Sequence, residues 1–247
     1  MFNFFKKKIS QQKEIKFNYE SVIVDMHSHV LPGIDDGAQT PEESVALVKR
    51  LMDLGIKKII ATPHVMADYY KNTPETIKNA LDILKAELVK EELTIEIEAA
   101  AEHYFDETFE PRIDNERLMT MGNKYVLFEF SFVNQPPNVT QAIQKMVSIG
   151  YKPILAHPER YAFMEIGQLK KLHTWGCSLQ LNTISLTGYY GKDAKNKAEE
   201  LVDNNMVDFI SSDMHHLRHA DALQNALRLP YLEKLLFDYP LKNSLLK

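Results

Sequence analysis

Two histidines separated by one residue, His27 and His29, directly follow the apolar run 21–25. A strand projects alternate residues to the same side, so both imidazoles can approach one cation at the carboxyl end of such a strand. Because imidazole nitrogen is a common ligand of transition metals, this spacing makes a metal site the first hypothesis. An isolated His-x-His pair is equally compatible with two histidines that merely lie on a loop.

Further side chains that can bind metal follow other apolar runs in the same way. They are His64 after 57–61, Glu102 after 93–100, Glu129 near the end of 124–130, His157 after 152–156, and Asp213 and His215 after 207–211. The carboxyl ends of parallel strands share one face of a barrel, and the active sites of such barrels lie on that face. Separate structural roles explain any single member, but they do not comfortably explain the whole set. We therefore expect these side chains to converge on one site.

The elements that must position these side chains alternate along the sequence. Apolar runs predict strands over 22–25, 57–61, 93–100, 124–130, 152–156, 178–182 and 207–211. Amphipathic segments predict helices over 41–54, 74–90, 139–149, 167–175 and 194–204. Repeated βα units with apolar strands predict a parallel sheet covered on both sides, and about seven strands are enough to close a barrel.

The composition limits what the site can belong to. The 247 residues are 45% hydrophobic and 26% charged, which is typical of a globular protein and fits one barrel-sized domain. We predict a single domain over 19–247 and a basic, aromatic appendage over 1–18 that lacks the apolar core of a signal peptide. No stretch approaches the length of a membrane span. The formal net charge of -5 disfavours nucleic-acid binding.

Cys177 is the only cysteine, which excludes an internal disulfide and a thiolate metal cluster. A single cysteine fits a reducing compartment, and we predict a cytoplasmic protein. Cys177 comes between Gly176 and a predicted strand, where a small buried hydrophobic residue is expected rather than a nucleophile.

Seven motifs spread over 21–215 resemble those of the polymerase and histidinol phosphatase (PHP) superfamily. They are DMHSH at 25–29, GIDDGA at 33–38, ATPH at 61–64, AE at 101–102, FEF at 128–130, AHPERY at 156–161 and SDMH at 212–215. More narrowly, the chain resembles the bacterial manganese-dependent protein tyrosine phosphatases that are encoded with capsule and exopolysaccharide genes. The resemblance implies an α/β fold, a distorted (β/α)7 TIM-like barrel (PHP fold), in agreement with the strand count.

The resemblance also implies a cluster of three metal ions, Mn2+ by the habit of the family, with Fe or Zn compatible with the same ligands. His27, His29, Glu102 and Asp213 would hold one ion; Glu102 would bridge to a second, completed by Glu129 and His157; and Asp36, His64 and His215 would hold the third. Asp35 would be either a partner of a ligand or a turn residue. We expect His103 and His216 to point away or support ligands, and His173 and His219 to be surface residues of helices.

The activity that the resemblance implies is hydrolysis of phosphotyrosine by a protein tyrosine phosphatase, a phosphoric monoester hydrolase. The implied substrate is the tyrosine-rich tail of a polysaccharide-export tyrosine kinase, so that the enzyme would regulate capsule and exopolysaccharide synthesis. Clustered divalent cations would neutralise the phosphoryl oxygens and lower the pKa of a coordinated water from about 15.7 toward about 7, which supplies a hydroxide nucleophile.

Arg160, three residues after His157, is predicted to bind the phosphoryl group through a forked pair of hydrogen bonds. A surface ion pair with Glu159 is the alternative for this arginine. Arg218 is a weaker candidate for the same task. His215 is expected to assist the leaving group, for which a metal-bound water is the alternative.

A different hydrolase on the same metal platform is the main competing function, either a small-molecule phosphatase of the histidinol-phosphate type or a phosphodiesterase. A non-catalytic module is disfavoured because the ligand set is complete, and an exonuclease is disfavoured by the acidic net charge. Tyr69, Tyr70, Tyr189 and Tyr190 lie in loops expected near the same face. They could stack on a phosphotyrosine ring or simply be exposed.

Overall fold

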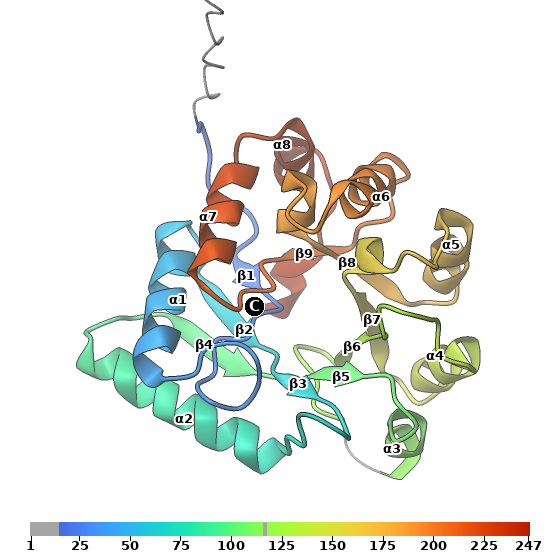
Figure 1. The fold of residues 1–247 in the computed structure, drawn as a ribbon, viewed down its shortest axis with the longest axis horizontal. Helices are drawn as coiled ribbons and strands as arrows, with labels where there is room; N and C mark the ends of the chain where they lie inside the picture. The colour runs from blue at the N-terminus through green and yellow to red at the C-terminus, as the bar shows by residue number, and fades with distance from the viewer. Residues whose placement is uncertain (1–14, 116–117) are drawn as a thin grey trace, which may run out of the picture.

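The computed structural model describes residues 15–115 and 118–247 and shows parallel strands surrounded by helices (Figure 1). One sheet has the order β1 (Val24–Asp25), β2 (Lys58–Ala61) and β4 (Glu96–Ala99). The other has the order β3 (His64–Val65), β5 (Glu102–Tyr104), β6 (Tyr125–Glu129), β7 (Lys152–Ala156), β8 (Ser178–Asn182) and β9 (Phe209–Ser211). Every strand pair is parallel. Most of the appendage expected over 1–18 lies outside the described residues.

The two sheets are parts of one ring. β2 leads into β3, and β4 into β5, after a two-residue break in each case. Backbone hydrogen bonding continues across these breaks, because the amide of Ala100 donates to the carbonyl oxygen of Ala61 over 2.8 Å. At the other side of the ring, an isolated parallel bridge between Ser28 and Met214 connects the segments that follow β1 and β9. The strands therefore form a distorted ring with seven parallel positions rather than one continuously paired barrel.

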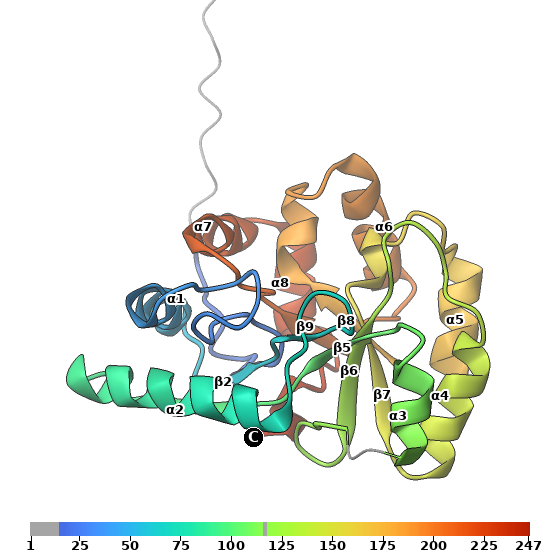
Figure 2. The same ribbon diagram turned by 60° about the horizontal axis from the view of Figure 1, so that its bottom comes forward.

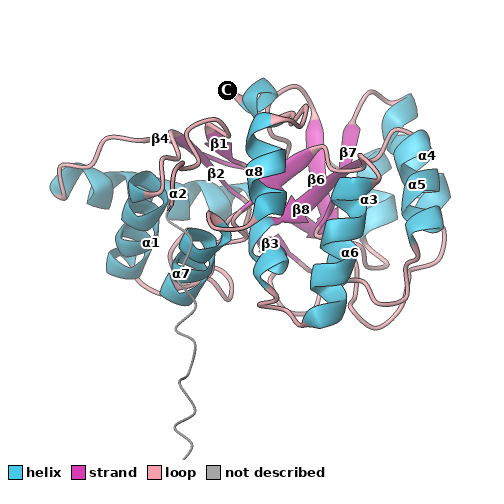
Figure 3. Cartoon of the chain, turned by 90° about the horizontal axis from the view of Figure 1, so that it is seen from above, coloured by secondary structure: helices cyan, strands magenta, loops and turns pink. Residues whose placement is uncertain are grey.

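Helices cover the outside of this ring (Figure 1, Figure 3). They are α1 (Pro41–Asp53), α2 (Pro74–Lys90), α3 (Phe109–Asn115), α4 (Val139–Ser148), α5 (Ile166–Thr174), α6 (Lys192–Asp203), α7 (Leu217–Ala226) and α8 (Pro230–Phe237), with 3-10 helices at Pro158–Arg160, Thr183–Thr187 and Asn243–Leu246. The threonines Thr40 and Thr73 cap α1 and α2, and a proline follows each cap. Within the described ranges, no helix combines the length and the apolar character that crossing a membrane requires.

Alternate strand residues pack in two separate apolar clusters. Val126 and Leu155 belong to the larger cluster, which the strands share with the helices. Leu127 and Ile154 belong to a smaller cluster that draws on five strands and on none of α1 to α8, so it fills the inside of the ring. Figure 2 shows β6, β7 and β8 side by side between the helices. Because alternate residues of a strand face the same side, Glu129 faces the inside of the ring of strands as Leu127 does, two residues further toward the carboxyl end of β6.

The parallel α/β architecture and the seven strand positions confirm the expectation from the sequence, whereas several boundaries differ. The predicted strand 22–25 is reduced to β1 because Ile23 has a positive φ of 67°. The predicted strand 93–100 begins only at Glu96, because Glu92 has a positive φ of 54° in the turn after α2. The helices α3, α7 and α8 are additional, and the last two follow β9, where no further strand marks a βα unit.

Asn243 ties the C-terminal 3-10 helix to two strands. Its Nδ2 donates to the carbonyl oxygens of Val24 (2.9 Å) and Ile210 (2.8 Å), and its Oδ1 accepts from the amide of Ile210 (3.1 Å). We expect Asn243→Ala to lower the free energy of unfolding by about 3 kcal/mol, because three buried backbone groups lose their partner. Urea denaturation measures this change. The control Asn79→Ala, on the exposed side of α2, should change stability by less than about 0.5 kcal/mol, and equal losses would contradict the prediction.

Candidate metal centre

Glu102 lies at the centre of the site, at the start of β5, with no exposed surface. Its Oε2 is 3.2 Å from His27 Nε2, 3.4 Å from His29 Nε2 and 3.2 Å from His64 Nδ1, and its Oε1 is 3.2 Å from His157 Nε2. Neither oxygen accepts a well-formed hydrogen bond from the described residues. Burial opposes ionisation, but the imidazoles, His27 foremost, hold the pKa of Glu102 well below its usual range. The site is therefore built around a buried, ionised carboxylate.

His27 and His29 present the same kind of nitrogen to a shared point. Their Nε2 atoms are 3.2 Å apart, and Asp213 Oδ1 is 3.4 Å from the first and 3.5 Å from the second. The Nδ1 atoms face other partners, Gln180 Oε1 at 3.0 Å and Asp35 Oδ2 at 2.8 Å. These outer contacts make each Nδ1 the donor and leave the Nε2 lone pairs directed inward, as in ligating histidines.

Asp35 combines both of the roles expected for it. Besides contacting His29, its Oδ1 accepts a hydrogen bond from the amide of Gly37 (3.0 Å), which closes the turn before α1. Burial alone would lower the pKa of His29, but the Asp35 carboxylate outweighs burial and raises that pKa to about 10. A metal ion at Nε2 would therefore have to displace a proton from this nitrogen. Asp35 therefore orients a candidate ligand and shapes the loop that carries Asp36.

A second group of candidate ligands joins Glu129 and His157 to Glu102. His157 Nε2 is 3.8 Å from Glu129 Oε2, and His64 Nδ1 is 3.0 Å from Glu129 Oε1. His157 has a left-handed backbone with φ 34°, and its amide donates to Gln180 Oε1 (3.3 Å). The turn at the end of β7 thus directs this imidazole toward Glu102 and Glu129, inside the ring of strands.

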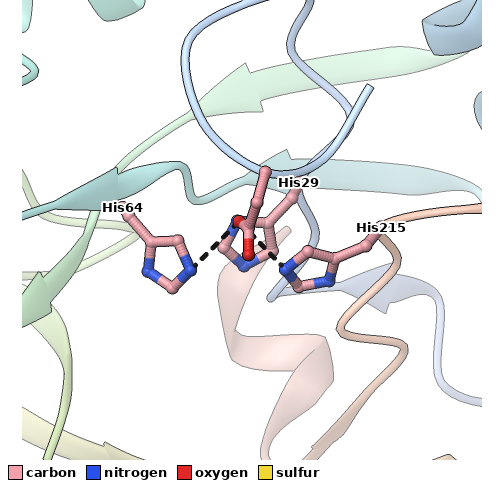
Figure 4. A group of neighbouring side chains, drawn as sticks. His29, His64 and His215 are labelled. Atoms are coloured by element: carbon pink, nitrogen blue, oxygen red, sulfur yellow. Dashed lines mark ion pairs between the residues drawn. The ribbon is translucent and has the colours of Figure 1, made fainter. Parts of the chain in front are cut away.

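Asp36 brings together the third group. Its Oδ1 lies 3.4 Å from His64 Nε2 and 3.5 Å from His215 Nε2. In Figure 4, His29, His64 and His215 lie side by side, and the rings of His29 and His215 are stacked with centroids 4.0 Å apart. His215 Nδ1 lies 2.9 Å from the carbonyl oxygen of Asp213, so this nitrogen is the donor and Nε2 is left for a ligand.

The predicted ligands therefore meet in one place. Ligand atoms within 4.8 Å of one another form four overlapping groups: His29, Asp36, His64 and His215; His27, His29 and Asp213; His27, Glu102 and His157; and His64, Glu102 and Glu129. Both Glu102 oxygens and His64 Nδ1 are buried and have no hydrogen-bond partner among the described residues, which is costly unless a cation lies between them. Imidazole and carboxylate donors without sulfur fit divalent Mn, Fe or Zn. The donor set thus fits metal ions.

Arg160 lies beside the same residues. Its Nη1 donates to Asp213 Oδ2 (3.1 Å), and its guanidinium carbon lies 4.4 Å from the centre of the Phe132 ring and 4.1 Å from that of Tyr190. The alternative ion pair with Glu159 is not formed. Glu159 is buried and instead accepts hydrogen bonds from the Ser185 hydroxyl (2.7 Å) and from a backbone amide of β8.

The structure contradicts the predicted position of His219 and agrees with that of His103. The expectation that His219 lies on the surface is wrong: it is 5% exposed, its Nδ1 is 3.0 Å from the carbonyl oxygen of Asp213, and burial lowers its pKa to about 4. It faces inward because α7 places it one turn after His215. His103 points away from the ligands as expected and packs near Phe109.

Other residues were not singled out by their sequence. Gln180, in the middle of β8, accepts hydrogen bonds at Oε1 and donates from Nε2 to Ser211 Oγ (2.7 Å). Asn182 Nδ2 donates to Asp213 Oδ2 (2.8 Å). In β8 the polar residues alternate with Leu179 and Leu181, and this alternation was the available signal. Arg218 is exposed and Cys177 is buried, as expected for the thiol.

A cavity of about 290 Å³ opens above the candidate ligands. Arg160, Phe132, Tyr190, His216 and His219 contribute to its walls. Phe132 is 45% exposed at its edge, whereas Glu102 below has no exposure. The cavity therefore leads from an aromatic edge down to a buried, polar floor.

Comparisons with known proteins match most of the chain. The family described as capsular polysaccharide synthesis, CpsB/CapC, matches residues 23–235. This chain belongs to the CpsB/CapC family. The tyrosine-protein phosphatase YwqE of Bacillus subtilis is 32% identical over 199 residues, which make up 79% of this chain and 78% of that protein.

Solved structures place the CpsB/CapC chain in the expected fold. One chain from the crystal structures of YwqE from Bacillus subtilis and CpsB from Streptococcus pneumoniae, described as metal-dependent tyrosine phosphatases, superposes with a TM-score of 0.79 at 31% identity and covers 89% of each chain. Histidinol phosphate phosphatase from Lactococcus lactis superposes with a TM-score of 0.51 at 13% identity, covering 83% of this chain and 92% of that one. At that identity the likeness shows a shared fold alone.

Gly37 packs against the backbone of His29, and this contact yields a test of the site. A Cβ at Gly37 would lie 2.0 Å from the carbonyl oxygen of His29. We expect Gly37→Ala to displace His29, to lower the metal content of the purified protein and to reduce the free energy of unfolding by about 1–3 kcal/mol. Mass spectrometry of the bound metals and urea denaturation measure both effects. Gly167→Ala, where a Cβ meets nothing within 4 Å, is the control, and full metal content in both variants would refute the expectation.

Proposed function

We propose that this CpsB/CapC protein is a metal-dependent protein tyrosine phosphatase with the nine convergent side chains as its metal ligands. The observation that supports the proposal most directly is the geometry around Glu102, where imidazole and carboxylate groups surround a buried charge beside Arg160. The similarity to YwqE, a tyrosine-protein phosphatase, supports the same activity. We favour Mn2+ as the metal, as the family resemblance implies.

The proposed assignment of ligands follows the three groups of side chains. His27, His29, Glu102 and Asp213 would hold one ion, Glu102 with Glu129 and His157 a second, and Asp36, His64 and His215 a third. When bound, such ions would neutralise phosphoryl oxygens and make a water acidic enough to attack phosphorus near neutral pH. The Nδ1 atoms of His27, His29 and His215 each contact an oxygen outside the ligand groups. These contacts orient the imidazoles, so that Nε2 of each is directed toward the proposed ion.

Arg160 is proposed to bind the phosphoryl group of the substrate. Asp213 occupies only one of its terminal nitrogens, and the guanidinium keeps further donors for an anion in the cavity. A forked pair of charged hydrogen bonds would strengthen as charge develops on the phosphoryl oxygens. His215 would hold its ion through Nε2, because Nδ1 already contacts the carbonyl oxygen of Asp213. As a ligand it could not donate a proton, so assistance to the leaving phenolate would come from His215 only in place of its metal contact, and otherwise from a water.

The depth of the cavity supports phosphotyrosine as the substrate. Glu102 in the floor is fully buried, while Phe132 in the wall is 45% exposed. A long, flat phosphotyrosine side chain can pass the aromatic edge and bring its phosphoryl group to the floor, whereas a phosphoserine side chain is much shorter. We propose that the physiological substrate is the tyrosine-rich tail of a polysaccharide-export tyrosine kinase in the cytoplasm, and that the domain responsible spans 19–247.

The substrate class can be tested with a panel of phosphate esters. We expect Mn2+-loaded protein to hydrolyse a phosphotyrosine peptide at least about tenfold more efficiently than the matching phosphoserine peptide or histidinol phosphate. Chelation should abolish hydrolysis, and added Mn2+ should restore it. Released phosphate measures the rate. Faster turnover of histidinol phosphate would assign the site to small molecules, and full activity after verified metal removal would refute the metal-dependent mechanism.

The role of Arg160 can be tested separately. We expect Arg160→Ala to reduce kcat/KM by an amount equivalent to about 2–4 kcal/mol of transition-state stabilisation. The metal content should stay at the wild-type level, because Arg160 is not among the proposed ligands. Arg50→Ala, which removes an ion pair with Asp221 at the surface, is the control and should leave kcat/KM unchanged. Wild-type kinetics in Arg160→Ala would remove the proposed phosphate contact.

A further inference from the structure

We propose that Phe132 and Tyr190 are positioning residues that hold the guanidinium of Arg160 between two aromatic rings and so determine which donors it offers to a phosphate ester. The inference rests on the proposed function of the site. The guanidinium carbon lies 4.4 Å from the centre of the Phe132 ring and 4.1 Å from that of Tyr190. Both rings line the same cavity as Arg160.

The two rings come from different parts of the fold, and other contacts fix each of them. Phe132 follows β6 and stacks on Tyr161, with centroids 5.7 Å apart and an interplanar angle of 26°. The Tyr161 hydroxyl accepts a hydrogen bond from the amide of Phe130 (3.0 Å), which anchors that ring to the end of β6. Phe132 is therefore supported from behind as it faces the guanidinium.

Tyr190 is held through the strand next to β7. Asn182, the last residue of β8, donates from Nδ2 to the Tyr190 hydroxyl (3.4 Å) and to Asp213 Oδ2 (2.8 Å). Asp213 Oδ2 also accepts the hydrogen bond from Arg160 Nη1 (3.1 Å). The Asn182 side chain thus connects the Tyr190 ring to Asp213, the carboxylate that binds Arg160. These contacts fix the position of the ring relative to the guanidinium.

Close packing leaves Arg160 few ways to bind a ligand. Its side chain is only 21% exposed, its guanidinium carbon lies over two aromatic rings, and one of its nitrogens contacts Asp213. The remaining N–H donors lie in the guanidinium plane, which is the geometry that binds two oxygens of a phosphoryl group at once. The neighbouring rings also reduce the contact of the guanidinium with water, which strengthens the charged hydrogen bonds that remain.

The aromatic rings can hold Arg160 close to the proposed cations despite their mutual repulsion. A free arginine beside divalent cations would be repelled toward solvent. The negative face of an aromatic ring attracts the guanidinium without adding a second carboxylate that would compete with phosphate for its donors. Asp213 supplies one anchoring oxygen, and the rings supply the rest of the restraint. Two neutral side chains can therefore set the position of a cation that must keep donors free.

Kinetics of ring variants test the inference. We expect Phe132→Leu and Tyr190→Leu each to lower kcat/KM for a phosphotyrosine peptide about tenfold at saturating Mn2+. Tyr190→Phe keeps the ring and loses only the long 3.4 Å contact with Asn182, so it should stay within about twofold of the wild type. In an Arg160→Ala background, adding Tyr190→Leu should cause no further loss, because the ring acts only through Arg160. Equal losses from Tyr190→Leu in both backgrounds, or none in either, would overturn the inference.

A spectroscopic readout separates this inference from the proposed activity. In the NMR spectrum of metal-free protein, ring currents should shift the Arg160 Nε–H resonance away from the usual position of an arginine. The resonance that is missing in the spectrum of Arg160→Ala is assigned to Arg160. The displacement should become smaller in Phe132→Leu and in Tyr190→Leu, because each variant removes one of the two rings, and should persist in Tyr190→Phe. An undisplaced resonance in the wild type would refute the stacked arrangement whatever the enzyme hydrolyses. If the resonance behaves as expected but the wild type does not hydrolyse phosphotyrosine, only the proposed function fails, and calorimetry with inorganic phosphate would test the same coupling by binding.

Discussion

A carboxylate buried at the centre of the ring has to be compensated, and much of the surrounding structure serves that purpose. Glu102 has no exposed surface, and four imidazoles lie within 3.4 Å of its oxygens. An isolated charge in such a place would strongly favour neutralisation or unfolding. Because these four imidazoles come from three segments, which follow β1, β2 and β7, parallel strands whose carboxyl ends meet are a condition for placing this charge.

The same requirement accounts for the strained backbone at two strand ends. His157 and Asp213 are not glycines, yet they have φ angles of 34° and 48°. Such conformations cost on the order of 1–3 kcal/mol each and persist only where other contacts enforce them. Here the amide of His157 donates to Gln180, and the amide of Asp213 donates to the carbonyl oxygen of His27 (2.9 Å). Hydrogen bonds to buried neighbours thus offset the cost of the backbone conformation that directs these two side chains toward the candidate metal centre.

The sequence predicted the parts of the fold and site that depend on local pattern. Apolar runs located the strands, and a polar residue at the end of a run identified a candidate ligand such as His64 or Glu102. Residues that act across the ring carry no such signal. Gln180 contacts His27 over a separation of 153 positions, and Phe132 and Tyr190 come close to the same guanidinium only in the folded chain. His219 was misjudged because its burial depends on α7, a helix without a following strand to reveal it.

Asp213 links the two halves of the site because its oxygens face different neighbours. Oδ1 lies near the Nε2 atoms of His27 and His29, and Oδ2 binds Arg160 and Asn182. A shift of this carboxylate would therefore move a candidate metal ligand and Arg160, the proposed phosphate-binding residue, together. Burial alone would raise the pKa of Asp213, but the surrounding positive groups, His27 foremost, hold it well below its usual range. The ionised carboxylate contacts the candidate ligands with one oxygen and the guanidinium with the other, so it couples the position of Arg160 to that of the candidate metal centre.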